Sequence, residues 1–171
     1  MKENKYLLKP ALKTVKQSFS LEDENGNIVY EAKMLKFSLF GASPFEFFNH
    51  ITNQKEEHKV GKTVTIEQGG NDVVSFLSKR SHFKFDGVKI WDYLHEKGIR
   101  IDSVPSGNKF GMTYNVSFQG SPVAVIATSS PKGKSFITTD LYYEITCSEQ
   151  NLDIVFLVAF AIAKTEQTFY N

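Results

Sequence analysis

The chain has 171 residues, a formal net charge of +1 and a hydrophobic content of 41%, with 23% charged residues. These values are ordinary for one globular domain, so they exclude wholesale disorder and give no electrostatic reason to expect a nucleic-acid partner. The single cysteine excludes an intramolecular disulfide and a cysteine-based zinc cluster. The amino terminus lacks a signal-peptide core and no stretch is long enough to span a membrane, so we expect a cytoplasmic protein without a transmembrane segment.

Most of the chain predicts short β-strands separated by turns. The strands at residues 15–21 and 28–34 flank Asn25-Gly26, a strong hairpin signal because both residues tolerate a positive φ. Further strands are predicted at residues 36–40, 45–52, 60–66, 73–85, 99–104, 112–119, 123–128, 134–138 and 141–147. Many short strands of this kind are typical of a sandwich or a barrel, and fifteen Phe and seven Tyr suit its core.

One amphipathic helix interrupts the strands. Val88, Trp91 and Leu94 recur at helical spacing, and Gly98 ends the segment. We predict a short helix near residues 87–97 that packs on the outside of the sheet or caps one end of it.

The apolar run at residues 154–163 is the strongest architectural signal. As an α-helix it rises only about 15 Å, too short for a membrane span. A helix that is apolar on all sides must be enclosed. Ser148 and Asn151 as N-caps and three alanines in the run favour a helix, whereas four β-branched residues leave a buried strand as the alternative. If the strands enclose this helix, the chain forms a β-barrel threaded by its own C-terminus.

Several short motifs fail on inspection. Residues 61–63, Gly-Lys-Thr, resemble the end of a phosphate-binding loop, but Glu56 replaces the required glycine. His95 begins a helical zinc motif whose second histidine is replaced by Ile99. We therefore predict no metal site and no cofactor. His50, His58 and His82 can converge only through the fold.

Cys147 is the one candidate nucleophile, but it lies where a strand meets the final helix and is expected to be a small buried residue. No serine-hydrolase elbow or paired-carboxylate site stands out, and Glu56-Glu57 lies in a charged stretch that resembles a solvated loop or an edge strand. We therefore expect a protein that is not an enzyme.

Local basic clusters are the remaining candidate sites. One contains Lys79, Arg80 and Lys84, a second contains Lys132 and Lys134, and a third contains Lys33 and Lys36. Lysines and a glycine in a turn can bind an anion through charge and backbone N–H groups. The alternative is a surface whose charges serve solubility only.

Two segments carry a family resemblance: the hairpin start Phe19-x-Leu21-x-Asp23-x-x-Gly26, continued by residues 27–30, and the final apolar segment at residues 153–163. They resemble the Tubby C-terminal-like superfamily, which includes LURP-one-related proteins and phospholipid scramblases. The resemblance covers about residues 5–168. It implies one domain with a mainly β fold plus helices (α+β), a closed antiparallel barrel of about twelve strands around a hydrophobic C-terminal helix.

The resemblance implies two functional precedents. Tubby proteins bind phosphoinositides through basic residues on the barrel, whereas scramblases carry a cysteine run and a calcium-binding segment that this chain lacks. No family site aligns residue by residue, so none is carried over.

Three hypotheses follow. The first is a non-enzymatic cytoplasmic barrel, peripheral at the membrane, that binds an anionic ligand such as a phospholipid headgroup. Its candidate residues are Lys79, Arg80, Lys84, Lys132 and Lys134. The alternative is a protein-interaction scaffold whose partner contacts Trp91 or Tyr93. A third, an enzyme with a pocket in the barrel mouth, requires one of the three histidines to meet carboxylates.

Overall fold

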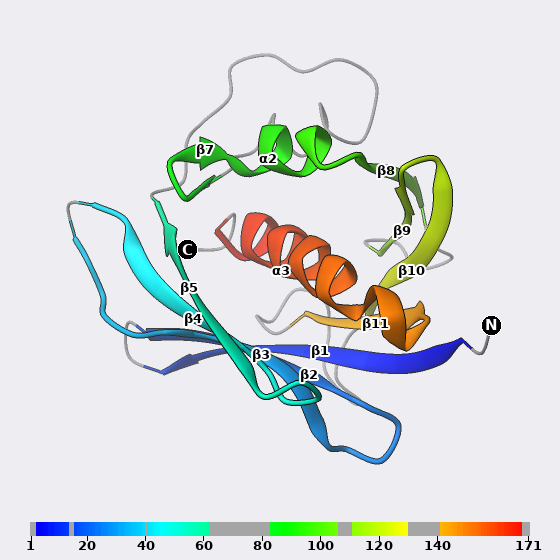
Figure 1. Cartoon of the computed structure of the whole chain (residues 1–171), viewed down its shortest axis with the longest axis horizontal. Helices are drawn as coiled ribbons and strands as arrows, with labels where there is room; N and C mark the ends of the chain where they lie inside the picture. Colours follow the sequence, from blue (N-terminus) through cyan, green and yellow to red (C-terminus); the bar gives the residue numbers. More distant parts are fainter. Residues whose placement is uncertain are drawn as a thin grey trace.

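The computed structural model describes residues 3–13, 16–39, 41–61, 83–105, 111–129 and 141–168. These residues form an eleven-stranded antiparallel sheet in the order β7-β6-β5-β4-β3-β2-β1-β11-β10-β9-β8 (Figure 1). The strands are β1 (Asn4–Lys13), β2 (Lys16–Glu22), β3 (Ile28–Met34), β4 (Ser43–Asn49), β5 (Gln54–Val60), β6 (Lys84–Phe85), β7 (Val88–Lys89), β8 (Ile99–Pro105), β9 (Met112–Phe118), β10 (Ser121–Ser129) and β11 (Tyr142–Cys147). The prediction of a mainly β fold is confirmed.

The sheet curls around the C-terminal helix α3 (Leu152–Thr168), which follows a short 3₁₀ turn, η1 (Glu149–Asn151) (Figure 1). Pairing of β1 with β11 joins the two halves of the chain into one sheet. The two ends of the sheet, β7 and β8, are linked by helix α2 (Ile90–Glu96). Within the described ranges β7 and β8 do not pair, so the sheet is open there. Closure of the barrel stays a prediction.

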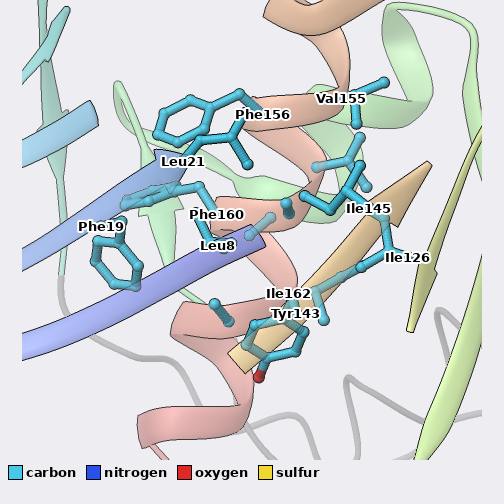
Figure 2. Close-up of a cluster of buried hydrophobic side chains, with 14 of the residues drawn as sticks. Leu8, Phe19, Leu21, Ile126, Tyr143, Ile145, Val155, Phe156, Phe160 and Ile162 are labelled. Carbon is cyan, nitrogen blue, oxygen red and sulfur yellow. The ribbon is translucent and has the colours of Figure 1, made fainter. Parts of the chain in front are cut away.

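Helix α3 forms the centre of the core, which confirms the predicted helix and excludes the buried strand. Its residues 158–163 have no solvent exposure. The Phe160 ring lies 4.8 Å from that of Phe19 and 5.0 Å from that of Phe47, and Phe156 stacks on Tyr30 at 4.3 Å. Figure 2 shows Phe156, Phe160 and Ile162 of α3 among side chains from β1, β2, β10 and β11. Because α3 satisfies its backbone hydrogen bonds internally, the sheet can cover it on several sides with apolar side chains alone.

The C-terminal end of α3 carries buried polar groups that are paired within the protein. The Glu166 carboxylate accepts hydrogen bonds from the hydroxyls of Tyr114 at 2.5 Å and Tyr143 at 2.6 Å. Lys164 Nζ donates to Gln17 Oε1 at 2.7 Å. Burial lowers the pKa of Lys164 to about 8.

The Asn25-Gly26 hairpin is confirmed, because β2 pairs with β3 and Gly26 has a φ of 83°. The predicted helix near residues 87–97 is shorter than expected. Asp86 and Gly87 both have positive φ values and form the turn of the β6–β7 hairpin, so Val88 is half exposed in a strand instead of facing the core from a helix. The buried face of α2 consists of Ile90, Trp91 and Leu94.

Other strand predictions differ from the structure. The predicted strand at residues 36–40 is wrong for residues 36–39, which lie in the β3–β4 connection with Phe37 and Leu39 exposed. The prediction for residues 134–138 and most of those for residues 60–66 and 73–85 fall outside the described residues. In the part of the chain that is described, no helix is long and apolar enough to cross a membrane.

Lys164 provides a test of the packing around α3. Its ordinary pKa is 10.5, so between about pH 8 and about pH 10.5 the unfolded chain binds more protons than the folded one. The unfolding free energy of the native protein, relative to that of a Lys164→Met variant, should therefore rise across this window by up to about 3 kcal/mol. Urea unfolding at pH 7 and pH 10 measures it.

A Lys55→Met variant, at an exposed position, is the control and should show no such rise. The native protein and the Lys164→Met variant differ in unfolding free energy. If this difference is the same at both pH values, the pKa of Lys164 is not lowered by burial.

Candidate functional site

The structure does not bring the five predicted basic residues together. Lys79, Arg80, Lys132 and Lys134 lie outside the described residues. Lys84 is exposed on β6, directly opposite Lys89 of β7. Lys84 is therefore the one residue of the predicted anion site that lies in the described part of the chain. Its neighbour Lys89 was not among the predicted residues.

Trp91 cannot serve as the exposed anchor that the scaffold hypothesis assigned to it. Its side chain is 5% exposed and packs in the core, because the apolar face of α2 turns inward. Tyr93 is half-buried, with its ring 5.0 Å from that of Phe85. Lys97 Nζ lies 4.9 Å from the centre of the Tyr93 ring.

Cys147 is a core residue, and His50 contacts a single carboxylate on the surface. Cys147 is 1% exposed at the end of β11, and burial raises the pKa of its thiol to about 12, as expected for a small core residue. His50 Nε2 lies 3.2 Å from Glu31 Oε1 on the surface, and His82 falls outside the described residues.

Strand β5 places polar side chains where a sheet of this kind usually carries apolar ones. Alternation along the strand places Gln54, Glu56 and His58 on the concave side of the sheet, where the Glu56 side chain is still 72% exposed, and Lys55 and Glu57 on the outer side. On the neighbouring strand the inward partners of Glu56 and His58 are two buried phenylalanines. A polar row on the concave side of β5 is therefore the main departure from the core pattern.

His58 is held between two carboxylates. Its Nδ1 lies 2.7 Å from Asp86 Oδ2 and its Nε2 lies 3.2 Å from Glu56 Oε2. The ring also lies 4.6 Å from the ring of Phe85. Both polar contacts are hydrogen bonds only when each ring nitrogen carries a proton, because a carboxylate accepts and does not donate.

Asp86 is fixed by the backbone of β5. Lys59 N donates to Asp86 Oδ1 at 2.8 Å, and Asp86 N donates to Lys59 O at 2.8 Å. The positive φ of Asp86 in the β6–β7 turn aims this carboxylate back toward β5. The orientation of the His58 ring is therefore set by a hairpin that is hydrogen-bonded to β5.

These side chains border a cavity of about 220 Å³, here called the α3 pocket. It lies between β5 on one side and the α2–β8 segment on the other, next to the N-terminal part of α3. The apolar and aromatic lining, here called the floor, consists of Tyr30, Phe47, Phe85, Tyr93, Ile99, Ile154 and Leu157. The polar lining, here called the rim, consists of Asn49, Gln54, Glu56, His58, Lys97 and Asp153. Ile154 and Leu157 are only half-buried, unlike the fully covered middle of α3.

Asp153 stands at the helix end of the pocket. Its Oδ1 accepts a hydrogen bond from Asn49 Nδ2 at 3.0 Å, and Asn49 is itself fixed by the backbone N–H groups of Ile51 and Thr52. Burial and the neighbouring Asp153 carboxylate raise the pKa of Tyr30, so its hydroxyl stays protonated at neutral pH. Two neutral side chains, Asn49 and Tyr30, thus orient the Asp153 carboxylate.

The site combines one wall of aromatic rings with titratable groups, an arrangement that suits binding of a small molecule. Within the described ranges, no group of three or more His, Cys, Asp or Glu side chains is arranged to hold a metal ion. From the sequence alone, His58 is one of three histidines that can converge only through the fold, and its neighbours Glu56 and Glu57 lie in a charged stretch typical of a solvated loop or an edge strand. The period-two placement of Gln54, Glu56 and His58 was the available signal.

No known family model, curated protein or solved structure matches this chain. The resemblance to the Tubby C-terminal-like superfamily therefore stays a prediction, and the function must be inferred from the geometry of the molecule.

Cys147 gives a direct test of the core assignment. Because its thiol is buried and protonated, a water-soluble disulfide reagent at pH 8 should modify the native protein at least about a hundred times more slowly than the urea-unfolded chain. Absorbance of the released thiolate measures the rate. Equal rates in the two states would show that Cys147 is accessible and would reopen its candidacy as a nucleophile.

Proposed function

We propose that this protein is a non-enzymatic binding protein that holds a small organic molecule in the α3 pocket. The observation that carries the proposal is the polar inward row of β5, Gln54, Glu56 and His58, facing the half-buried apolar residues Ile154 and Leu157 of α3. An apolar cavity with a few convergent polar groups is the usual form of a ligand site.

The contrast along α3 supports this reading. Its middle is completely covered by side chains from the sheet, whereas the floor of the pocket keeps apolar surface in contact with water. Leaving these two large aliphatic side chains partly exposed forgoes some of the roughly 25 cal/mol per Å² that burial contributes. A ligand with an apolar body recovers that contribution.

Binding is favoured over catalysis by the state of the reactive groups. Both nitrogens of His58 contact carboxylates, so neither is free to act as a general base in this arrangement. The Cys147 thiol is buried away from the pocket lining. The pocket is therefore better suited to recognition than to proton transfer.

A second candidate function is the binding of an anionic ligand, such as a phospholipid headgroup at the cytoplasmic membrane surface. The observation favouring it is the direct opposition of Lys84 and Lys89 on the β6–β7 hairpin. Like charges directly across a sheet are unfavourable, and among the described residues no carboxylate lies within ion-pair distance of either ammonium. An anion between them would relieve the repulsion.

The fold proposal that accompanies these functions is a closed barrel of the Tubby C-terminal-like type. The curvature of the sheet around α3 and the link from β7 to β8 through α2 support it (Figure 1). A solved structure of a close homologue with an unrelated topology would remove it.

The pocket proposal is tested by blocking the cavity. An Ile154→Trp variant should fill the α3 pocket, whereas Val125→Trp changes an exposed residue of β10 and is the control. Benzylamine, benzyl alcohol and benzoate are titrated separately into ¹⁵N-labelled protein. At least one should shift the amide signals of His58 and Leu157 in the native protein and in the control.

Ile154→Trp should weaken that binding by about tenfold or more, because the indole occupies the space of the probe. If none of the three probes shifts the pocket signals, or if Ile154→Trp binds as well as the control, the protein does not use the α3 pocket in this way.

The second candidate is tested by co-sedimentation with anionic and neutral liposomes at low and physiological salt. A double variant, Lys84→Glu with Lys89→Glu, should bind anionic vesicles at least about tenfold more weakly, since each basic residue near the surface contributes about 1 kcal/mol. Lys16→Glu with Lys55→Glu is the charge-matched control. Equal binding by the two double variants would remove Lys84 and Lys89 from any lipid site.

A further inference from the structure

We propose that the ligand of the α3 pocket is a small organic cation whose apolar body is about the size of one aromatic ring. This inference rests on the proposed function and specifies the ligand class of the same site. It follows from the charge of the rim, the chemistry of the walls and the size of the cavity.

Negative charge exceeds positive charge in and beside the pocket. Glu56 and Asp153 line it, and Asp86, which is not part of the lining, contacts His58. These three carboxylates stand against Lys97 and, when it is protonated, His58. The sum is therefore −2 with a neutral His58 (−3 + 1) and −1 with a protonated one (−3 + 2). The N-terminus of α3 adds roughly half a positive charge, which does not reverse the sign. A cavity with this potential attracts cations and repels anions.

Asp153 gives this charge a fixed position. Asn49 holds the carboxylate at 3.0 Å and Tyr30 lies beside it, and both are neutral donors. Among the described residues, no lysine, arginine or histidine nitrogen lies within 4 Å of the Asp153 carboxylate. A ligand ammonium can therefore complete an ion pair that the protein itself leaves open.

The aromatic walls reinforce the same preference. Tyr30, Phe47, Phe85 and Tyr93 line the cavity, and the face of an aromatic ring attracts a cation. The structure already contains such a contact at the rim, because Lys97 Nζ lies 4.9 Å from the centre of the Tyr93 ring. Lys97 thus places the protein's own ammonium where a ligand ammonium would gain the same interaction.

The cavity volume limits the size of the ligand. An apolar cavity of roughly 150 Å³ accommodates benzene, and the α3 pocket measures about 220 Å³. One ring with a short charged arm therefore fits, with the ring on Ile154 and Leu157 and the arm toward Glu56 and Asp153.

Three probes that share one aromatic ring and differ in charge test the charge preference. Benzylamine carries a positive charge at neutral pH, benzyl alcohol is neutral and benzoate is negative. Titrated into ¹⁵N-labelled protein at pH 7 and low salt, benzylamine should bind at the His58 and Leu157 signals at least about tenfold more tightly than either of the others.

Paired variants then locate the interaction. Glu56→Gln should weaken benzylamine binding about three- to tenfold, whereas Glu57→Gln, which removes the same charge from the outer face of β5, should leave it unchanged. Lys97→Met should tighten binding, because it removes the competing ammonium from Tyr93. Opposite effects at Glu56 and Lys97 are not expected from a loss of folding.

Two negative results are distinguishable. The cation preference is wrong if benzyl alcohol or benzoate binds the pocket as tightly as benzylamine. It is also wrong if Glu57→Gln weakens benzylamine binding as much as Glu56→Gln does. In both cases the pocket remains a binding site. If none of the probes shifts the pocket signals, the proposed function fails together with this inference.

Discussion

The enclosure of α3 determines how the strands of the sheet are arranged. A helix that is apolar on every side cannot lie on a flat sheet, because one half of its surface would remain in water. The eleven strands therefore curl around it, β1 pairs with β11 to make the curved sheet continuous, and α2 links the two ends (Figure 1). The small side chains of Ala159, Ala161 and Ala163 are fully buried, which lets the surrounding elements approach closely.

The polar side chains at the two ends of α3 have different surroundings: those at the C-terminal end are buried and paired, and those at the N-terminal end border the α3 pocket. At the C-terminal end, Lys164 and Glu166 are buried and their side chains are satisfied by Gln17, Tyr114 and Tyr143. Buried polar groups need such partners. At the N-terminal end, the polar groups surround the α3 pocket and one of them, Asp153, is exposed. Side chains of the protein seal the first end, and the second end borders the pocket that we propose as a ligand site.

Sequence reasoning identified the features that are set locally. The apolar run of α3 and the Asn25-Gly26 turn depend on neighbouring residues, and both agree with the structure. The pocket could not be predicted in the same way, because His58 and Asp86 meet through the pairing of β5 with a distant hairpin. Its polar row was hidden because inward and outward charges alternate along β5. Most of the predicted basic residues lie outside the described part of the chain, so their grouping stays a prediction.

Hydrogen–deuterium exchange of the α3 amides is the measurement to make first, since the core and the α3 pocket are both built on the enclosed helix. If the sheet covers α3, the amides of residues 155–163 should be among the slowest to exchange and should open only with global unfolding. The exposed turn at residues 24–27 serves as the fast reference. Exchange in α3 as fast as in that turn would show that the helix is not enclosed, and the α3 pocket would lose its floor.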